Sequence, residues 1–240
     1  MTADTRFRVM WWVEIVDDGI VLADVKLNSS YENLKRQAGE RIDVPPDRRF
    51  LGFDAYQKAL DCLKPGDLAL FATPPAFRWV HFGYAIKKGL HVFMEKPVTV
   101  DAPTTKKMFA LAEEADKKNL KVGVGLMVRH CKARQELLKR IQDGAIGEVV
   151  SIEENFLRAP YVVTERKPEY SELEWQCSTQ YHFRWLGGDD VPQSLVHNLD
   201  RSSWVLGNAA TRPKLNAKLP DALVKNLARL ATELNIAPLA

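Results

Sequence analysis

The chain has 240 residues, of which 46% are hydrophobic and 27% are charged, enough for one large core or two modest ones. Lysine and arginine exceed aspartate and glutamate by only three (34 against 31), and no dense basic run with interleaved aromatic residues argues for nucleic-acid binding. The apolar runs fall far short of the roughly 20 residues of a membrane helix, and MTADTRFRVM lacks the apolar core of a signal peptide. These features predict a cytoplasmic protein with neither a membrane nor a nucleic-acid partner.

The three cysteines, Cys62, Cys131 and Cys177, are far apart in the sequence and form no CxxC pair. An odd number of widely spaced cysteines is typical of a reducing compartment and not of a disulfide or zinc framework. We therefore expect neither a disulfide nor a metal site.

The N-terminal region contains two apolar runs, FRVMWWVEIV and IVLADV, that are separated only by Asp17-Asp18-Gly19. Parallel strands need a crossover of a dozen or more residues, whereas such a short link suits a tight hairpin. The sequence therefore predicts an antiparallel pair of strands at this end.

Strands and helices then alternate between residues 67 and 144. Short apolar runs at 67–72, 91–96 and 120–125 predict buried strands, and amphipathic segments after each predict helices. One helix should stop at Gly89, and the next should begin at Asp101 with Pro103 in its first turn. This alternation predicts right-handed crossovers and a parallel sheet that is covered on both faces.

Three segments leave the carboxyl ends of these strands: Thr73-Pro74-Pro75, Glu95-Lys96-Pro97 and residues 126–130. Ligands of open α/β sheets bind outside this edge, so the three segments should meet at one crevice. Lys96 stands at a strand end and is restricted by the proline that follows it. This placement makes Lys96 a candidate acid or substrate clamp.

The rest of the chain gives weaker signals. Residues 149–156 are expected to form a strand whose uncovered edge would favour association, so a homo-oligomer is among the expected states. Residues 157–180 are polar and predict an irregular loop over the crevice. An amphipathic helix is expected from about Asp221.

Several segments together resemble one known family. The segments are ATPPAFRWVHFGYAIKKGLHVFMEKP, QELLKRIQDGAIGEVVSIEENF and WLGGDDVPQSLVHNLDRSSWVLG. They resemble, in this order, the nucleotide-binding domain, the linking helix with the first substrate-domain strand, and the catalytic helix of the glucose-fructose oxidoreductase / inositol dehydrogenase (Gfo/Idh/MocA) family. The resemblance runs from about Val21 to Gly207.

The resemblance implies an α/β fold with an incomplete Rossmann-like parallel sheet, preceded by the N-terminal antiparallel hairpin and followed by a reduced α+β substrate domain. A Rossmann-like nucleotide-binding domain without its glycine-rich turn would span residues 1–126. A partial substrate or catalytic domain, mainly helical, would span residues 127–240.

The resemblance also implies an activity: NAD- or NADP-dependent hydride transfer at a hydroxyl of a sugar, cyclitol or related polyol. Lys96 matches the family lysine that contacts the reacting hydroxyl, and His197 matches the acid-base histidine. Such a reaction needs a base with a pKa near neutrality and a cation beside the forming oxyanion. Gln193 stands where many relatives carry an aspartate, and glutamine cannot relay a proton.

The cofactor-binding residues implied by the resemblance lie in two regions. Asp24 matches the acidic residue that binds the adenosine ribose, although it could equally be a polar residue of a helix or turn. Thr73, Pro74, Pro75 and Glu95 would line the cofactor side of the crevice. Arg129 could contact cofactor or substrate, or could be a solvated surface residue.

The glycine-rich turn that holds the cofactor pyrophosphate is missing, because residues 1–38 contain only one glycine, Gly19. Binding of NAD or NADP is therefore expected to be impaired. Two hypotheses remain: an oxidoreductase of this family, or a catalytically silent, truncated relative that serves as a binding or association module.

Overall fold

The computed structural model describes most of the chain. The described residues are 10–12, 20–161, 165–168 and 170–207. They divide into two compact units, the first within residues 1–127 and 156–196 and the second within residues 128–155 and 197–240. None of the described helices is long and apolar enough to cross a membrane.

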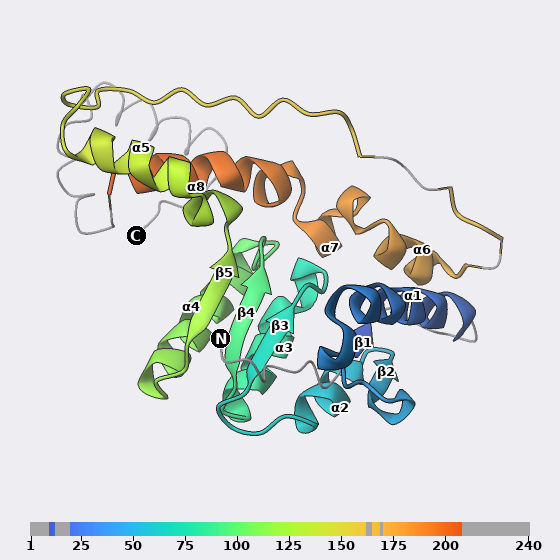
Figure 1. The fold of residues 1–240 in the computed structure, drawn as a ribbon. Coiled ribbons are helices and arrows are strands. Elements are labelled where there is room, and N and C mark those ends of the chain that lie inside the picture. Colours follow the sequence, from blue (N-terminus) through green and yellow to red (C-terminus); the bar gives the residue numbers. More distant parts are fainter. Residues whose placement is uncertain (1–9, 13–19, 162–164, 169, 208–240) are drawn as a thin grey trace. The chain divides into compact units, whose positions relative to one another are not determined.

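The first unit begins with a parallel pair of strands. β1 (Met10–Trp12) pairs with β2 (Arg49–Leu51), and α1 (Ile20–Ala38) separates them in the sequence (Figure 1). The predicted antiparallel hairpin is therefore wrong. The Asp17-Asp18-Gly19 link on which it depended lies outside the described residues.

The spacing of buried residues explains why IVLADV begins a helix and not a strand. Leu27 is buried, and Tyr31, Leu34 and Ala38 are half-buried, at the intervals of three and four residues that one helix face requires. A short apolar run by itself fits a strand or a helix, so the longer period that follows it decides. Asp24 accordingly lies within α1 and not at the end of a strand.

Three parallel strands form a second sheet in the order β3-β4-β5. They are β3 (Leu68–Phe71), β4 (His91–Glu95) and β5 (Val122–Gly125). α2 (Ala55–Asp61) precedes β3, α3 (Arg78–Lys87) connects β3 to β4, and α4 (Ala102–Lys117) connects β4 to β5. The predicted alternation of strands and helices is confirmed.

The predicted helix boundaries are also confirmed. α3 ends just before Gly89, which has a φ of 70°. Asp101 caps α4, because its Oδ1 accepts a hydrogen bond from the Thr104 backbone N–H at 2.7 Å.

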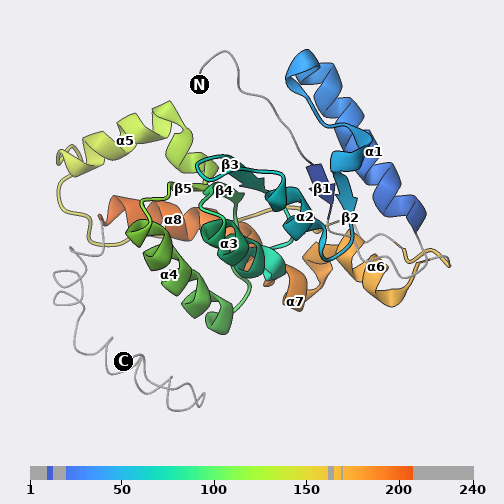
Figure 2. The same ribbon diagram turned by 90° about the horizontal axis from the view of Figure 1, so that it is seen from below.

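The core of the first unit lies on one face of this sheet. α3 and α4 cover the face that carries Ala69, Phe71, Val92 and Met94, which are all buried (Figure 2). On β3 the residues of the opposite face are exposed: Leu68 by 50% and Leu70 by 47%. The expectation of a fully buried strand at 67–72 is therefore wrong, since both connecting helices pack on the same side.

The irregular loop predicted for residues 157–180 is confirmed only in part, because its described residues up to Lys167 form neither a helix nor a strand but a helix forms near its end. α6 (Glu172–Ser178) and α7 (Arg184–Gly187) are followed by a π-helical turn, Val191–Leu195. Ser171 and Glu174 cap α6 reciprocally: the Glu174 N–H donates to Ser171 Oγ and the Ser171 N–H donates to Glu174 Oε2. This Ser-x-x-Glu pattern is a known helix-start signal, and it was overlooked in the sequence.

The described residues of the second unit include α5 (Lys132–Gln142) and most of α8 (Val196–Val205). Residues 149–156, predicted as a strand, form neither a strand nor a helix. A strand requires a hydrogen-bonded neighbour, and no strand of the described part of the chain pairs with this segment. The helix predicted from about Asp221 lies outside the described residues.

Two leucine truncations test whether only one face of the sheet is covered. Leu90→Ala empties a site that is 0% exposed, so we expect the free energy of unfolding to fall by about 2–5 kcal/mol. Leu70→Ala should lower it by less than about 1 kcal/mol, because Leu70 is already half in solvent. Urea unfolding measures both values, and equal losses would show that the second face is covered in solution.

Candidate functional site

The carboxyl ends of β3, β4 and β5 lie at one edge of the sheet. Phe71 is opposite Met94, and Glu95 is opposite Gly125, so the chain leaves all three strands at the same level. Lys96 and Leu126 follow the ends of β4 and β5 directly, and Thr73 follows the end of β3 after one residue. The predicted placement of the three segments at one edge is confirmed. The cavity at this edge is lined by residues of the second and third segments and not by Thr73, Pro74 or Pro75.

A buried arginine joins two of these segments. Arg78 is 2% exposed; its Nε donates to the Thr73 carbonyl oxygen at 2.7 Å, and its Nη1 donates to the Glu95 carbonyl oxygen. Burial lowers the pKa of Arg78 to about 10, against the opposing effect of the Glu95 carboxylate, so the guanidinium is charged at neutral pH. Arg78 was not among the site residues predicted from the sequence, although it shares a helix face with Phe82 and Ala85.

His81, one turn along α3, is buried beside this arginine. Its Nδ1 lies 3.1 Å from Thr73 Oγ1, and its ring is 4.5 Å from the Tyr56 ring between centroids. Burial, together with the positive charge of Arg78, lowers the pKa of His81 to about 3. The imidazole is therefore neutral, and both the hydroxyl and the carbonyl of Thr73 have partners within the protein.

Lys96 is half-buried where the chain leaves β4. Its ammonium donates a hydrogen bond to the backbone carbonyl oxygen of Gln193. Burial lowers the pKa of Lys96, and the neighbouring Glu95 carboxylate partly opposes this effect. The Lys96–Pro97 peptide bond is cis. The lysine is thus held in place by an acceptor almost a hundred residues away in the sequence.

Gln193 itself is 4% exposed, and its Nε2 donates to the Gly187 carbonyl oxygen at 3.0 Å. Its side chain therefore supports the turn between α7 and the π-helical segment. Gly188 in this turn has a φ of 82°, and a Cβ there would lie 3.0 Å from Val100 Cα. The Gly187-Gly188 turn consequently packs against the backbone that follows Lys96-Pro97.

A cavity of about 290 Å³ lies beside Lys96. Its walls are mostly apolar, with polar groups from Lys96, Thr99, Asp101 and Thr105. The apolar lining residues are Pro97, Val98, Val100, Val124, Leu126, Pro192 and Val196. An ammonium group beside an apolar wall can stabilise a developing oxyanion more strongly than it could in water.

Two of the predicted site residues belong to the second unit. His197 is half-buried in the first turn of α8. Arg129 forms an ion pair with Asp200, with Nη2 2.8 Å from Oδ1, and its guanidinium lies 5.2 Å from the centre of the Trp204 ring. Arg129 therefore has a partner within its own unit. Its side chain is still 39% exposed, and its contact with cofactor or substrate stays a prediction.

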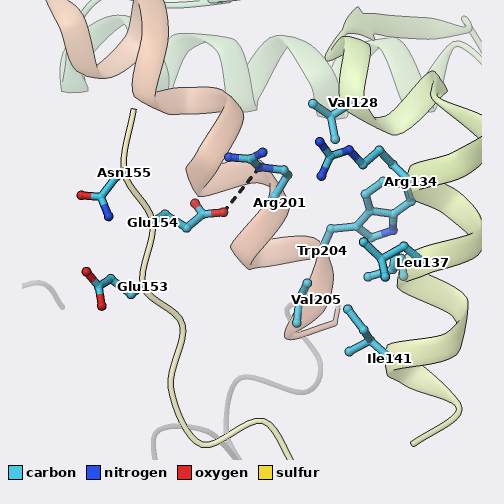
Figure 3. A pocket seen from close by; sticks show the side chains of 11 residues that line it. Val128, Arg134, Leu137, Ile141, Glu153, Glu154, Asn155, Arg201, Trp204 and Val205 are labelled. Atoms are coloured by element: carbon cyan, nitrogen blue, oxygen red, sulfur yellow. Dashed lines mark ion pairs between the residues drawn. The ribbon is translucent and has the colours of Figure 1, made fainter. Parts of the chain in front are cut away.

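The second unit has its own cavity of about 360 Å³ between α5, α8 and residues 153–155 (Figure 3). Arg201 of α8 lies 3.4 Å from Glu154, and Asn198 donates to the Asn155 carbonyl oxygen at 3.1 Å. These contacts hold the irregular segment against α8. The remaining lining residues are Val128, Arg134, Leu137, Leu138, Ile141, Glu153, Trp204 and Val205.

Comparison with known families finds a match for the part of the chain that forms the three-stranded sheet. Residues 29–126 match the Gfo/Idh/MocA family, described as an oxidoreductase family with an NAD-binding Rossmann fold. This part of the chain is similar to that family. The match ends at Leu126, directly after β5, and includes the Thr73 and Lys96 segments.

Two curated relatives are similar over longer stretches. A dTDP-3,4-didehydro-2,6-dideoxy-alpha-D-glucose 3-reductase from Actinomadura kijaniata is 30% identical over 152 residues, which cover 56% of this chain and 43% of the relative. An inositol 2-dehydrogenase from Leifsonia xyli is 24% identical over 208 residues, which cover 85% of this chain and 54% of the relative. The chain thus spans about half the length of these relatives.

A solved structure supports the fold alone. The oxidoreductase domain protein from Kribbella flavida superimposes with a TM-score of 0.52 at 17% identity, covering 75% of this chain and 43% of that one. The Rossmann-like α/β fold of the first unit agrees with this likeness and with the family match.

A glycine pair tests the packing of the turn beside Lys96. Alanine at Gly188 or at Gly66 adopts an unfavourable positive φ, but only Gly188 has close neighbours, since nothing lies within 4 Å of a Cβ at Gly66. We expect Gly66→Ala to cost about 1–2 kcal/mol of unfolding free energy and Gly188→Ala a further 1–3 kcal/mol. Equal losses in urea unfolding would contradict this packing.

His81 predicts a specific pH dependence of stability. Its pKa falls from 6.5 in the unfolded chain to about 3 in the folded one, so the unfolded state binds more protons between these values. Stability is therefore fully present above pH 6.5 and decreases as the pH falls, by up to about 1.4 kcal/mol per pH unit.

The matched control is the exposed His130. Urea unfolding between pH 6.5 and 5 should show a flatter profile for His81→Gln and an unchanged profile for His130→Gln. Parallel profiles for wild type and His81→Gln would contradict the burial of a neutral imidazole.

Proposed function

We propose that this chain is an NAD(P)-dependent oxidoreductase of the Gfo/Idh/MocA type that acts on a hydroxyl of a sugar, cyclitol or related polyol. The observation that carries the proposal is Lys96, a half-buried ammonium beside a cavity at the carboxyl edge of a parallel sheet. The similarity to an inositol 2-dehydrogenase and to a nucleotide-sugar reductase supports this substrate class.

In the proposed mechanism Lys96 binds the reacting oxygen. Its lowered pKa makes the ammonium a better proton donor, and its positive charge favours the oxyanion that forms as the hydroxyl proton leaves. His197 acts as the base that removes this proton. Bound NAD(P) supplies the hydride acceptor.

Gln193 is proposed as a positioning residue and not as a proton carrier. Its backbone carbonyl fixes the Lys96 ammonium, and its side chain holds the turn that lies on Val100. An amide cannot take up a proton, so the relay available to an aspartate is absent from this role.

The residues that would hold the cofactor fit it only in part. β1, α1 and β2 form the parallel unit with a helical crossover that dinucleotide-binding folds use, and Thr73, Pro74, Pro75 and Glu95 lie at the edge that receives the ligand. Asp24, within α1, no longer has the strand-end position from which its ribose contact was inferred.

The residues between β1 and α1 read VEIVDDG, with a single glycine and two aspartates before the helix. Backbone amides of a glycine-rich turn normally receive the pyrophosphate, and carboxylates would repel it. We propose that NAD(P) binds more weakly than a glycine-rich turn would allow. This sequence also favours the second candidate function, a catalytically silent binding or association module.

A cofactor titration tests this reading. NADH should quench tryptophan fluorescence without saturating at low micromolar concentration, and Asp17→Asn/Asp18→Asn should tighten binding roughly five-fold or more by removing two negative charges. The control Asp116→Asn/Asp143→Asn makes the same charge change at exposed positions. Saturation of the wild type at low micromolar NADH would contradict weak binding.

Turnover distinguishes the two candidate functions. With NAD or NADP and a panel of polyols that includes myo-inositol, Lys96→Met should lower kcat by about a hundred-fold or more and leave NADH binding unchanged. Lys106→Met, at an exposed position of α4, should leave kcat unchanged. Undetectable turnover in a folded wild type that is saturated with NAD or NADP would support the silent module instead.

A further inference from the structure

A second cavity of the first unit lies away from Lys96, among α2, α3 and α4. Its volume is about 630 Å³, within the usual range for small-molecule sites. It shares no lining residue with the cavity beside Lys96. Its lining residues are Tyr56, Gln57, Trp79, Val80, Gly83, Tyr84, Lys87, Lys107, Ala110 and Leu111. We call this cavity the helix groove.

Aromatic rings and a glycine give the helix groove its shape. Trp79, Gly83 and Lys87 lie four residues apart on α3 and therefore on one helix face. The Tyr84 ring meets the Tyr56 ring edge-on, with the centroids 5.7 Å apart. Because Gly83 has no side chain, the floor is open down to Leu111, whose Cδ2 lies 3.5 Å from where a Cβ of Gly83 would be.

The charges that line the helix groove are all positive. Lys107 Nζ lies 3.7 Å from the centre of the Trp79 ring, and Lys87 is exposed at the end of α3. No carboxylate is among the lining residues. The carboxylate of Glu114 forms an ion pair with Lys118, with Nζ 2.8 Å from Oε1. The hydrogen bond from Lys118 and, to a smaller extent, the positive charge of Lys87 lower the pKa of Glu114.

The other polar groups of the groove already have partners. The Tyr84 hydroxyl donates to Asp61 Oδ1 at 2.9 Å, and Asp61 also pairs with Lys88 at 2.9 Å. Gln57 Nε2 donates to the Tyr56 hydroxyl oxygen at 3.0 Å. What the groove offers a ligand is therefore an aromatic, apolar surface with two ammonium groups.

We propose that the helix groove binds a small amphiphilic anion, with an aromatic or other flat apolar body and one carboxylate, sulfonate or phosphate group. The apolar body packs against Trp79, Tyr84 and Leu111, and the anionic group meets Lys87 and Lys107. Aromatic rings contribute large buried areas, and the two ammonium groups select the sign of the charge. This site is independent of hydride transfer at Lys96.

Anilinonaphthalene sulfonate, a fluorescent dye with this chemistry, is a suitable probe. The folded chain should bind it saturably, with an increase in dye emission. Lys87→Glu/Lys107→Glu should weaken binding at least ten-fold. Lys106→Glu/Lys117→Glu makes the same change of charge at exposed positions of α4 that do not line the groove, and should leave binding within about two-fold of wild type.

A second variant blocks the groove without removing charge. Gly83→Leu replaces a glycine in the interior of α3, which favours the helix by about 1 kcal/mol, and its Cβ meets Leu111 at an ordinary contact distance. The variant should remain folded by circular dichroism and lose dye binding at least ten-fold.

Any of the following results would overturn the proposal: no saturable dye binding, equal effects of the two lysine pairs, or full dye binding by Gly83→Leu. Displacement of the dye by NADH, with no effect of the groove substitutions, would also overturn it, because the dye would then occupy the nucleotide side of the sheet.

Discussion

The arrangement at the sheet edge depends on one buried cation. The Arg78 guanidinium donates to the backbone carbonyls that follow β3 and β4, and in doing so it fixes two loops to the start of one helix. Burying a charge without partners costs several kcal/mol, and removing one partner of a buried pair leaves an uncompensated group. Because both acceptors are backbone atoms, the arginine sets the separation of the two loops, and this separation does not depend on which side chains the loops carry. Lys96 follows directly from one of these acceptors.

The regular parts of the fold were predictable because their local signals agree with their tertiary roles. Asp101 and Gly89 mark helix boundaries that the structure keeps, and the three apolar runs between residues 67 and 125 form the parallel strands. The N-terminal prediction failed where a short apolar run was read without its continuation, since Leu27, Tyr31 and Leu34 extend a helical period. β3 was read as buried on both faces, but a run such as LALF does not reveal on which side the helices will pack.

The candidate site could be predicted from the sequence only in part. The convergence of Thr73, Lys96 and Leu126 follows from parallel strands, so the sequence could predict it. The contact between Lys96 and Gln193 could not be predicted, because it joins segments almost a hundred residues apart through a backbone atom. Arg78 and His81 were overlooked because polar residues on an amphipathic helix are usually solvated, and only their spacing relative to Phe82 and Ala85 shows that they face inward.

The backbone acceptor of Lys96 affects how the site tolerates substitution. A side chain at position 193 does not itself receive the ammonium, so a replacement there reaches the lysine only by shifting the turn that Gln193 supports. Residues of different charge could therefore occupy this position while the lysine keeps its orientation. The residue type at position 193 and the geometry of Lys96 can thus vary separately. In such a scaffold a substitution at position 193 can add or remove a group that carries a proton while the Lys96 ammonium keeps its position.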